Sequence, residues 1–209
     1  MKIMKTRWKE YLSVHPWKAV AMAGVFAVFL YFLYRFLGYV ECRNGVVLDD
    51  PLLAIIPSYD VSVPLFFITY AASLAGVGYV IRDPALTFYT LLSYMLIHTC
   101  RIVCMFFTPL DPPSAIIPLR DFFLEGTFYA GHVNVKDLFF SGHTATMFLF
   151  FMVIENKKIK YIYLLLTIAV AILLLIQHAH YTIDILMALL VVWFSCIMAK
   201  KMKIFWDND

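Results

Sequence analysis

Six long apolar runs constrain this chain more than any other feature of its sequence. They cover residues 17–39, 61–81, 85–107, 138–154, 161–176 and 182–198. A helix needs about 20 mostly apolar residues to cross a bilayer, and the first three runs reach that length. The last three are shorter, so we expect their ends at the membrane interface. The pattern predicts an all-α fold, a polytopic bundle of six transmembrane helices that forms a single domain over residues 1–209.

The composition favours a membrane protein and argues against a nucleic-acid partner. Hydrophobic residues make up 63% of the 209 positions and charged residues only 15%. That is too little charge to cover the surface of a soluble domain of this length. The net charge is only +3, and the basic residues lie beside the apolar runs, which is typical of membrane ends. The spacing of the four cysteines matches no disulfide or zinc framework.

The distribution of Lys and Arg predicts the orientation of the bundle. The basic residues gather before the first run, between the second and third, between the fourth and fifth, and after the sixth. They are Lys2, Lys5, Arg7, Lys9, Lys18, Arg82, Lys157, Lys158, Lys160, Lys200, Lys201 and Lys203. With six spans these segments all lie on one side, which the positive-inside rule makes cytoplasmic. We therefore expect cytoplasmic termini, with residues 1–16 as an arm on the inner membrane surface.

Two polar clusters open the fourth and sixth runs, which both begin on the outer side. The first, "SGHT", contains Ser141 and His143, and the second, "QHAHYTID", contains His180 and Asp184. His180 and Asp184 are four residues apart, so on a helix the carboxylate can orient the imidazole and leave its other nitrogen as nucleophile or base. Ionisable groups in a span are costly and indicate function. The alternative is a pair of interfacial histidines tied into helix caps.

Cations near the same depth are candidates for binding a phosphate. Arg101 lies in the third run, three residues after His98, and an arginine there could hold phosphate by charge-assisted hydrogen bonds or snorkel to the outer surface. Ser141 and the free amides at a helix start make an anion site. The longest connection, residues 108–137, is expected to be ordered over the outer face. It adds three candidates that are otherwise solvated loop residues: Arg120, His132 and Lys136.

The chemistry suited to these groups is phosphoryl transfer. One histidine attacks phosphorus, the second protonates the departing oxygen, and cations stabilise the charge on the other oxygens. His178 and His180 form an H-x-H pair, but no convincing fourth metal ligand accompanies them. We therefore expect no metal and no cofactor.

These motifs are together similar to one known family. "SGHT" and "HYTID", preceded by "RIVCMFFTPLDPP" from Arg101 and "HVNVKDLFFSGHT" from His132, resemble the sphingomyelin synthase branch of the lipid phosphatase and phosphotransferase superfamily. The likeness covers roughly residues 101–190, and the second stretch includes Asp137, four residues before Ser141. The first two predicted helices match the family only in their hydrophobic pattern.

The resemblance implies a reaction and a set of residues. The family moves a phospho-headgroup from a glycerophospholipid to ceramide and releases diacylglycerol, so the partners are membrane lipids. By resemblance His180 is the nucleophile, Asp184 orients it, and His143 is the acid and then the base. The residues expected to bind the substrate phosphate are Arg101, Ser141, Lys136, His132 and Asp137.

Three departures from related families bear on specificity. Leu173 and Leu174 replace the S-R pair of the wider phosphatase superfamily, and its K-x6-R-P motif is missing, which argues against a simple lipid phosphatase. Ala179 stands where animal sphingomyelin synthases have an acidic residue, so the headgroup is either phosphoethanolamine or phosphocholine. The short chain resembles bacterial members and implies a bacterial inner membrane with an extracytoplasmic site. A lipid hydrolase, in which water replaces ceramide, and a non-catalytic membrane module are the alternatives.

Overall fold

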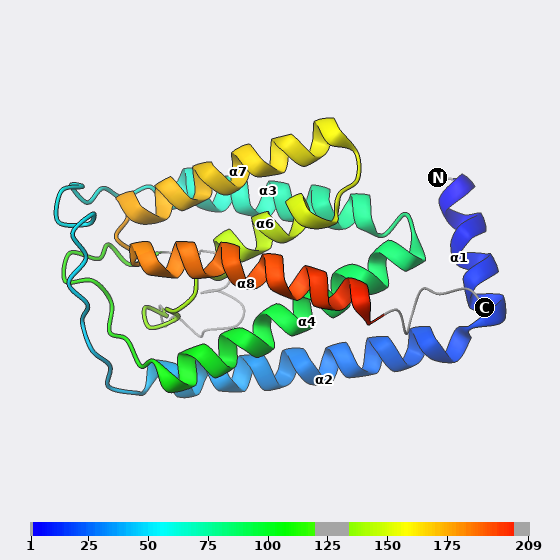
Figure 1. The fold of residues 1–209 in the computed structure, drawn as a ribbon, viewed down its shortest axis with the longest axis horizontal. Coiled ribbons are helices and arrows are strands. Elements are labelled where there is room, and N and C mark those ends of the chain that lie inside the picture. The colour runs from blue at the N-terminus through cyan, green and yellow to red at the C-terminus, as the bar shows by residue number, and fades with distance from the viewer. Residues whose placement is uncertain (1, 120–133, 203–209) are drawn as a thin grey trace.

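The computed structural model describes residues 2–119 and 134–202, with side chains from Arg7 onward, as an elongated bundle of helices (Figure 1). No β-strand occurs in these ranges, so the predicted all-α fold is confirmed. The helices of the described residues are α1 (Lys2–Val14), α2 (Pro16–Glu41), α3 (Ser62–Val80), α4 (Pro84–Phe107), α6 (Gly142–Val153), α7 (Lys157–Ile176) and α8 (Thr182–Lys201).

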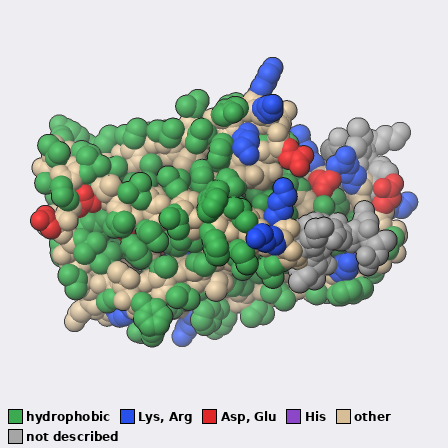
Figure 2. Space-filling model, viewed as in Figure 1, with side chains coloured by type: hydrophobic (Ala, Val, Ile, Leu, Met, Phe, Trp, Pro, Cys, Tyr) green, Lys and Arg blue, Asp and Glu red, His purple; other side chains and the backbone are tan. Residues whose placement is uncertain are grey.

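Five of these helices are long and apolar enough to cross a membrane: α2, α3, α4, α7 and α8. Many of their large apolar side chains point outward, such as Phe32 on α2, Phe67 and Leu74 on α3, and Leu165 on α7. Figure 2 shows that hydrophobic side chains cover most of one long face of the bundle. Soluble monomers rarely expose so large an apolar surface. The protein is therefore a multi-pass membrane protein.

The fourth predicted run, residues 138–154, differs from a full-length span. Only α6 within it is helical, and its 12 residues extend about 18 Å. The Ser141 side chain caps this helix, with Oγ accepting a hydrogen bond from the Thr144 amide at 3.3 Å. The preceding Leu138 and Phe140 are buried in non-helical backbone. Helix α6 packs against α3, α4, α7 and α8, so it forms the buried centre of the bundle.

Local signals explain where the surrounding helices begin. Asp83 accepts a hydrogen bond from the Leu86 amide at 3.0 Å and precedes a proline at the first position of α4. Asn156 accepts bonds from the Lys158 and Ile159 amides at 3.1 and 3.2 Å. Both residue types are favoured N-caps, and proline is favoured at a first helical position. The cap at Asn156 starts α7 four residues before the predicted run 161–176.

The helices divide the molecule into two ends (Figure 1). Helix α1 and the last turn of α8 lie at one, here called the terminal end. The starts of α6 and α8 lie at the other, here called the histidine end. The predicted arm over residues 1–16 is largely the helix α1, which packs on the start of α4: Trp8 Nε1 donates to the Ile81 carbonyl at 2.7 Å, and its ring lies 6.3 Å from that of Phe88.

Candidate functional site

His180 and Asp184 form a buried pair at the start of α8. The Nδ1 atom of His180 lies 3.2 Å from Oδ2 of Asp184, and the two side chains are 5% and 0% exposed. A carboxylate only accepts hydrogen bonds, so Nδ1 carries the proton and donates it. This fixes the tautomer and leaves a lone pair on Nε2, the nitrogen that can act as a nucleophile or a base.

Contacts from distant loops hold this pair in place. The Tyr181 amide donates to the same Asp184 oxygen at 3.0 Å, and the Tyr181 hydroxyl donates to the Asp111 carbonyl at 2.9 Å. The Thr182 amide and hydroxyl donate to the Asp50 carboxylate at 2.6 and 3.0 Å. The first turn of α8 is thus fastened to the connection before α3 and to the segment after α4, and the imidazole has little freedom to turn.

His143 is the second residue of α6 and reaches the same end of the bundle. Its ring is partly exposed and packs edge-on against Phe66 of α3, with centroids 6.0 Å apart. The Ser141 amide donates to the backbone carbonyl of Asp184 at 3.3 Å. That bond joins the start of α6 to the first turn of α8, so His143 and His180 lie at the same level although 37 residues separate them in the sequence.

Arg101 braces the segment that leads into α6. Its Nε donates to the Phe140 carbonyl at 2.8 Å, and Nη2 donates to Oδ1 of Asp137 at 2.6 Å. The side chain is 4% exposed, so it points into the bundle instead of snorkelling to the outer surface. The guanidinium also lies against Gly142, where an added Cβ would come within 3.2 Å of three guanidinium atoms. A side chain at position 142 would therefore require the guanidinium to shift by a few tenths of an ångström.

Asp137 connects these groups electrostatically. Burial raises the pKa of its carboxyl, but the charge and hydrogen bond of Arg101, together with the charges of His180 and His143, outweigh burial and hold this pKa below its usual value. Opposite charges lower a carboxyl pKa only when they are near. A guanidinium, two imidazoles and a carboxylate therefore share one region at the histidine end.

The other predicted phosphate-binding residues occupy different surroundings. Lys136 lies 2.8 Å from the Asp111 carboxylate, and its backbone amide donates to Glu41 at 3.0 Å. These contacts fasten the end of the 108–137 connection to its own beginning and to the last residue of α2. Ser141 is fully buried as the cap of α6. His132 and Arg120 lie outside the described residues.

The two remaining histidines noted in the sequence have structural contacts. His98 is buried one turn before Arg101, and its ring packs against that of Tyr94 at a tilt of 47°, with centroids 4.1 Å apart. His178 Nε2 lies 2.8 Å from the Ile56 carbonyl, to which it donates. Within residues 2–119 and 134–202 no three His, Cys, Asp or Glu side chains are grouped so that they could hold a metal ion.

Sequence reasoning missed Gln177, which joins three segments near the site. Its Nε2 donates to Ser62 Oγ at 2.9 Å and to the Ile117 carbonyl at 3.1 Å, and its Oε1 accepts from the Val61 amide at 2.6 Å. The side chain is fully buried. Its position beside the "HAHYTID" motif was the only available signal, because its partners come from distant connections.

A hollow of about 380 Å³ lies beside the first turn of α8. Apolar side chains from two segments form much of its wall: Leu48, Pro51 and Leu52 from the connection before α3, and Ile183 and Leu186 from α8. Tyr181 and Thr182, which follow His180 directly, also line it. An apolar surface thus reaches the edge of the histidine end.

Residues 136–202 match a family model described as PAP2 superfamily C-terminal. The match covers about a third of the chain and contains α6, α7 and α8 with all three of His143, His180 and Asp184. A search of curated proteins found no match. The fold and this match are consistent with a membrane protein of the lipid phosphatase and phosphotransferase superfamily.

Proposed function

We propose that the protein is a membrane phosphotransferase that moves a phospho-headgroup from a glycerophospholipid to ceramide and releases diacylglycerol. The observation that carries this proposal is the buried His180–Asp184 pair joined to the start of α6, which bears His143. The position of the two histidines at one end of a bundle of apolar helices supports a lipid substrate, because lipid headgroups lie at the ends of membrane-spanning helices. The resemblance of "SGHT" and "HYTID" to sphingomyelin synthases supports ceramide as the acceptor.

In the first half-reaction His180 receives the headgroup. Its Nε2 attacks the phosphorus of the donor lipid, and the bond from phosphorus to the diacylglycerol oxygen breaks. His143, protonated, gives its proton to that oxygen, so diacylglycerol leaves as a neutral alcohol. Asp184 stabilises the positive charge that His180 gains. The product on the enzyme is a phosphohistidine that carries the headgroup.

In the second half-reaction the roles reverse. His143 takes the proton of the primary hydroxyl of ceramide, the hydroxyl oxygen attacks phosphorus, and the bond from phosphorus to Nε2 breaks. Arg101 supplies positive charge to the non-bridging oxygens, and the amides at the start of α6 add hydrogen bonds beside Ser141. We assign supporting phosphate contacts to Lys136, His132 and Asp137, with Asp137 acting through Arg101.

The apolar hollow beside Tyr181 and Thr182 suits a lipid substrate. Its walls from Leu48, Leu52 and Leu186 can accept part of an acyl chain while the headgroup lies at the histidines. Ala179 is small and buried next to His180 and adds no charge, so we assign both phosphoethanolamine and phosphocholine as candidate headgroups.

The sidedness that we propose is a bacterial inner membrane with cytoplasmic termini and an extracytoplasmic histidine end. The lysines at 157–160 and 200–203 support it through the positive-inside rule. Single cysteines introduced at position 158 and at position 121 test it in a cysteine-free background. A membrane-impermeant reagent added from outside should label position 121 alone, and labelling of position 158 alone would reverse the orientation.

The experiment that tests the reaction supplies purified protein with mixed phospholipids, with and without ceramide. Mass spectrometry should find a ceramide phospho-headgroup lipid and an equal amount of diacylglycerol only when ceramide is present. The variant His143→Ala should form neither product. Diacylglycerol accompanied by free phospho-headgroup, at a rate that ceramide does not change, would instead identify a lipid hydrolase with the same histidines.

A further inference from the structure

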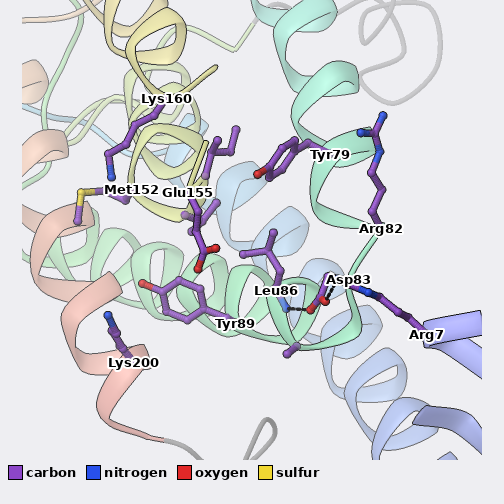
Figure 3. Close-up of a pocket in the computed structure, with 13 residues that line it drawn as sticks. Arg7, Tyr79, Arg82, Asp83, Leu86, Tyr89, Met152, Glu155, Lys160 and Lys200 are labelled. Atoms are coloured by element: carbon purple, nitrogen blue, oxygen red, sulfur yellow. Dashed lines mark hydrogen bonds and ion pairs between the residues drawn. The ribbon is translucent and has the colours of Figure 1, made fainter. Parts of the chain in front are cut away.

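A second cavity, lined by several charged residues, lies at the terminal end, far from the histidines. It has a volume of about 670 Å³ and is lined by the C-terminal part of α3, the start of α4, the end of α6, and residues of α1, α7 and α8. Figure 3 shows six charged side chains around it: Arg7, Arg82, Asp83, Glu155, Lys160 and Lys200. Nothing in the proposed reaction uses these groups.

The charges of this cavity do not cancel. Arg7 is paired with Asp83 at 2.6 Å. Of the four others, Arg82, Lys160 and Lys200 are positive and Glu155 is negative, which leaves two positive charges in excess. Within the part of the chain that the structure describes, none of these three cations has a carboxylate within ion-pair distance. The cavity therefore carries a positive potential that an anion can neutralise.

The two lysines converge on the cavity from different helices. In Figure 3 the side chains of Lys160 on α7 and Lys200 on α8 lie on one side of the cavity, with the Lys160 amine near Met152 and the Lys200 amine near Tyr89. The Lys160 ammonium lies 4.8 Å from the centroid of the Phe151 ring, a cation–π contact that helps to hold it in place. Leu86 and Met152 add apolar wall. The cavity therefore has two lysines on one side and an apolar margin, at the start of α7 and the end of α8.

We propose that this cavity binds a phosphate-bearing anion, for which the headgroup of an anionic glycerophospholipid is the source that the position favours. Its volume lies in the range of roughly 300–1,000 Å³ that is usual for small-molecule sites. Basic pockets between helix ends at a membrane surface suit anionic headgroups, because each lysine adds about 1 kcal/mol of attraction there. The bound anion would lie on the side of the cavity that Lys160 and Lys200 line, and Arg82 adds positive charge from the opposite side (Figure 3).

The effect of Glu155 on ligand affinity distinguishes an anionic ligand from a zwitterionic one. Its carboxylate lines the same cavity as the two lysines and points toward Tyr89 (Figure 3). A negative charge there repels an anion and attracts the ammonium group of a zwitterionic headgroup. Replacing it by glutamine removes the charge with little change in shape. For an anionic ligand Glu155→Gln should therefore strengthen binding, and for a zwitterionic ligand it should weaken binding.

The test is a titration of the full-length protein in detergent with short-chain phosphatidylglycerol and phosphatidylcholine, read by native mass spectrometry. Phosphatidylglycerol should bind the wild type at least about tenfold more tightly than phosphatidylcholine, since only the former has net charge. The double variant Lys160→Gln/Lys200→Gln should lose about tenfold or more in affinity for phosphatidylglycerol. The matched control is Lys157→Gln/Lys158→Gln, which removes the same charge from exposed residues outside the cavity.

Equal losses in the two double variants would mean that binding follows overall charge, and would overturn the site. Equal binding of the two lipids, or weaker binding of phosphatidylglycerol by Glu155→Gln, would overturn it as well. Inorganic phosphate added to the complex distinguishes the two sources of the ligand. Persistence of the lipid supports a headgroup site, and displacement that depends on Lys160 and Lys200 assigns the same cavity to free phosphate.

Discussion

Two carboxylates near helix starts, Asp83 and Asp184, lie at opposite ends of the bundle, and each accepts a hydrogen bond from one nearby backbone amide and pairs with one basic side chain. Asp83 accepts a hydrogen bond from the Leu86 amide and pairs with Arg7 at 2.6 Å. Asp184 accepts one from the Tyr181 amide and pairs with His180 at 3.2 Å. Their surroundings differ: the side chains are 32% and 56% exposed for Asp83 and Arg7, against 0% and 5% for Asp184 and His180.

This difference in exposure separates a structural contact from a candidate catalytic one. Water screens an exposed ion pair, which contributes about 0–1 kcal/mol. A buried carboxylate acts on its neighbour through a low dielectric, so it can fix a tautomer and stabilise a charge that appears during reaction. We therefore expect that replacing Asp184 changes the behaviour of His180. Replacing Arg7 or Asp83 should have little effect on the other residue of that pair.

The largest expected effect is that of His180→Ala. The substitution removes the proposed nucleophile, so the rate of headgroup transfer should fall by at least about a thousandfold. Donor lipid with a radiolabelled headgroup should leave label on the wild type and none on the variant. His15→Ala, the same change at the terminal end, is the control and should keep both rate and label. A variant that retained a tenth of the wild-type rate would exclude His180 as nucleophile.

Asp184→Asn should separate catalysis from folding. Asparagine can still accept the Tyr181 amide, so the melting temperature should change little, but it cannot stabilise a positive His180 and the rate should fall by about 10²–10⁴. Asp184→Ala should in addition lower the free energy of unfolding by about 1–3 kcal/mol, because the buried Tyr181 amide loses its acceptor. Parallel measurement of rate and melting temperature tests this, and equal activity of Asp184→Asn and wild type would contradict the proposed role.

Arg101→Lys should have an intermediate effect. Lysine keeps the charge but lacks the planar fork that reaches both the Phe140 carbonyl and Asp137, so the free energy of unfolding should fall by about 1–2 kcal/mol. The exposed residue Arg35 on α2 provides the control Arg35→Lys, which should leave stability unchanged. Denaturation in mixed detergent micelles measures the free energy of unfolding of the two variants, Arg101→Lys and Arg35→Lys. If the two variants matched, the contacts of Arg101 would not brace the start of α6.

The sequence was sufficient to predict features that depend on residues close together in the chain. The apolar run 17–39 predicted most of α2. The contact between His180 and Asp184 was also predicted, but from a shared helix face, whereas His180 lies just before Tyr181, the N-cap of α8, and is not helical. Helix α6 was predicted too long, since an apolar run does not reveal where a capping serine starts the helix. The catalytic roles themselves remain predictions.

What could not be read from the sequence depends on contacts between distant segments. Arg101 and Asp137 are 36 residues apart, and no local pattern assigns one to the other. Lys136 was predicted to bind phosphate from its place in the connection 108–137, and nothing in the sequence indicated that folding pairs it with Asp111, 25 residues away. The terminal cavity likewise combines Lys160 and Lys200, which the sequence presented only as markers of orientation.

The lowered pKa of Asp137 predicts a modest dependence of stability on pH. Its folded pKa lies below the usual value of 3.8, so the unfolded chain binds the proton more readily. The stabilisation is therefore complete above about pH 5 and is lost as the pH falls through the folded pKa. The excess melting temperature of wild type over Asp137→Asn should be constant from neutral pH to about pH 5 and shrink below about pH 4. An excess that grew in acid would contradict the arrangement around Arg101.

The smallest expected effects belong to the exposed pair at the terminal end. Arg7→Met should lower the free energy of unfolding by only about 0–1 kcal/mol, because Arg7 and Asp83 are both screened by water. Asp83→Ala should cost about 0.5–2 kcal/mol, since it also removes the N-cap of α4 that accepts from Leu86. Neither variant should change the transfer rate by more than about twofold, because the pair lies at the other end of the bundle from His180. Denaturation curves and rates for both variants test this together, and a large loss of rate in Arg7→Met would mean that the two ends are coupled.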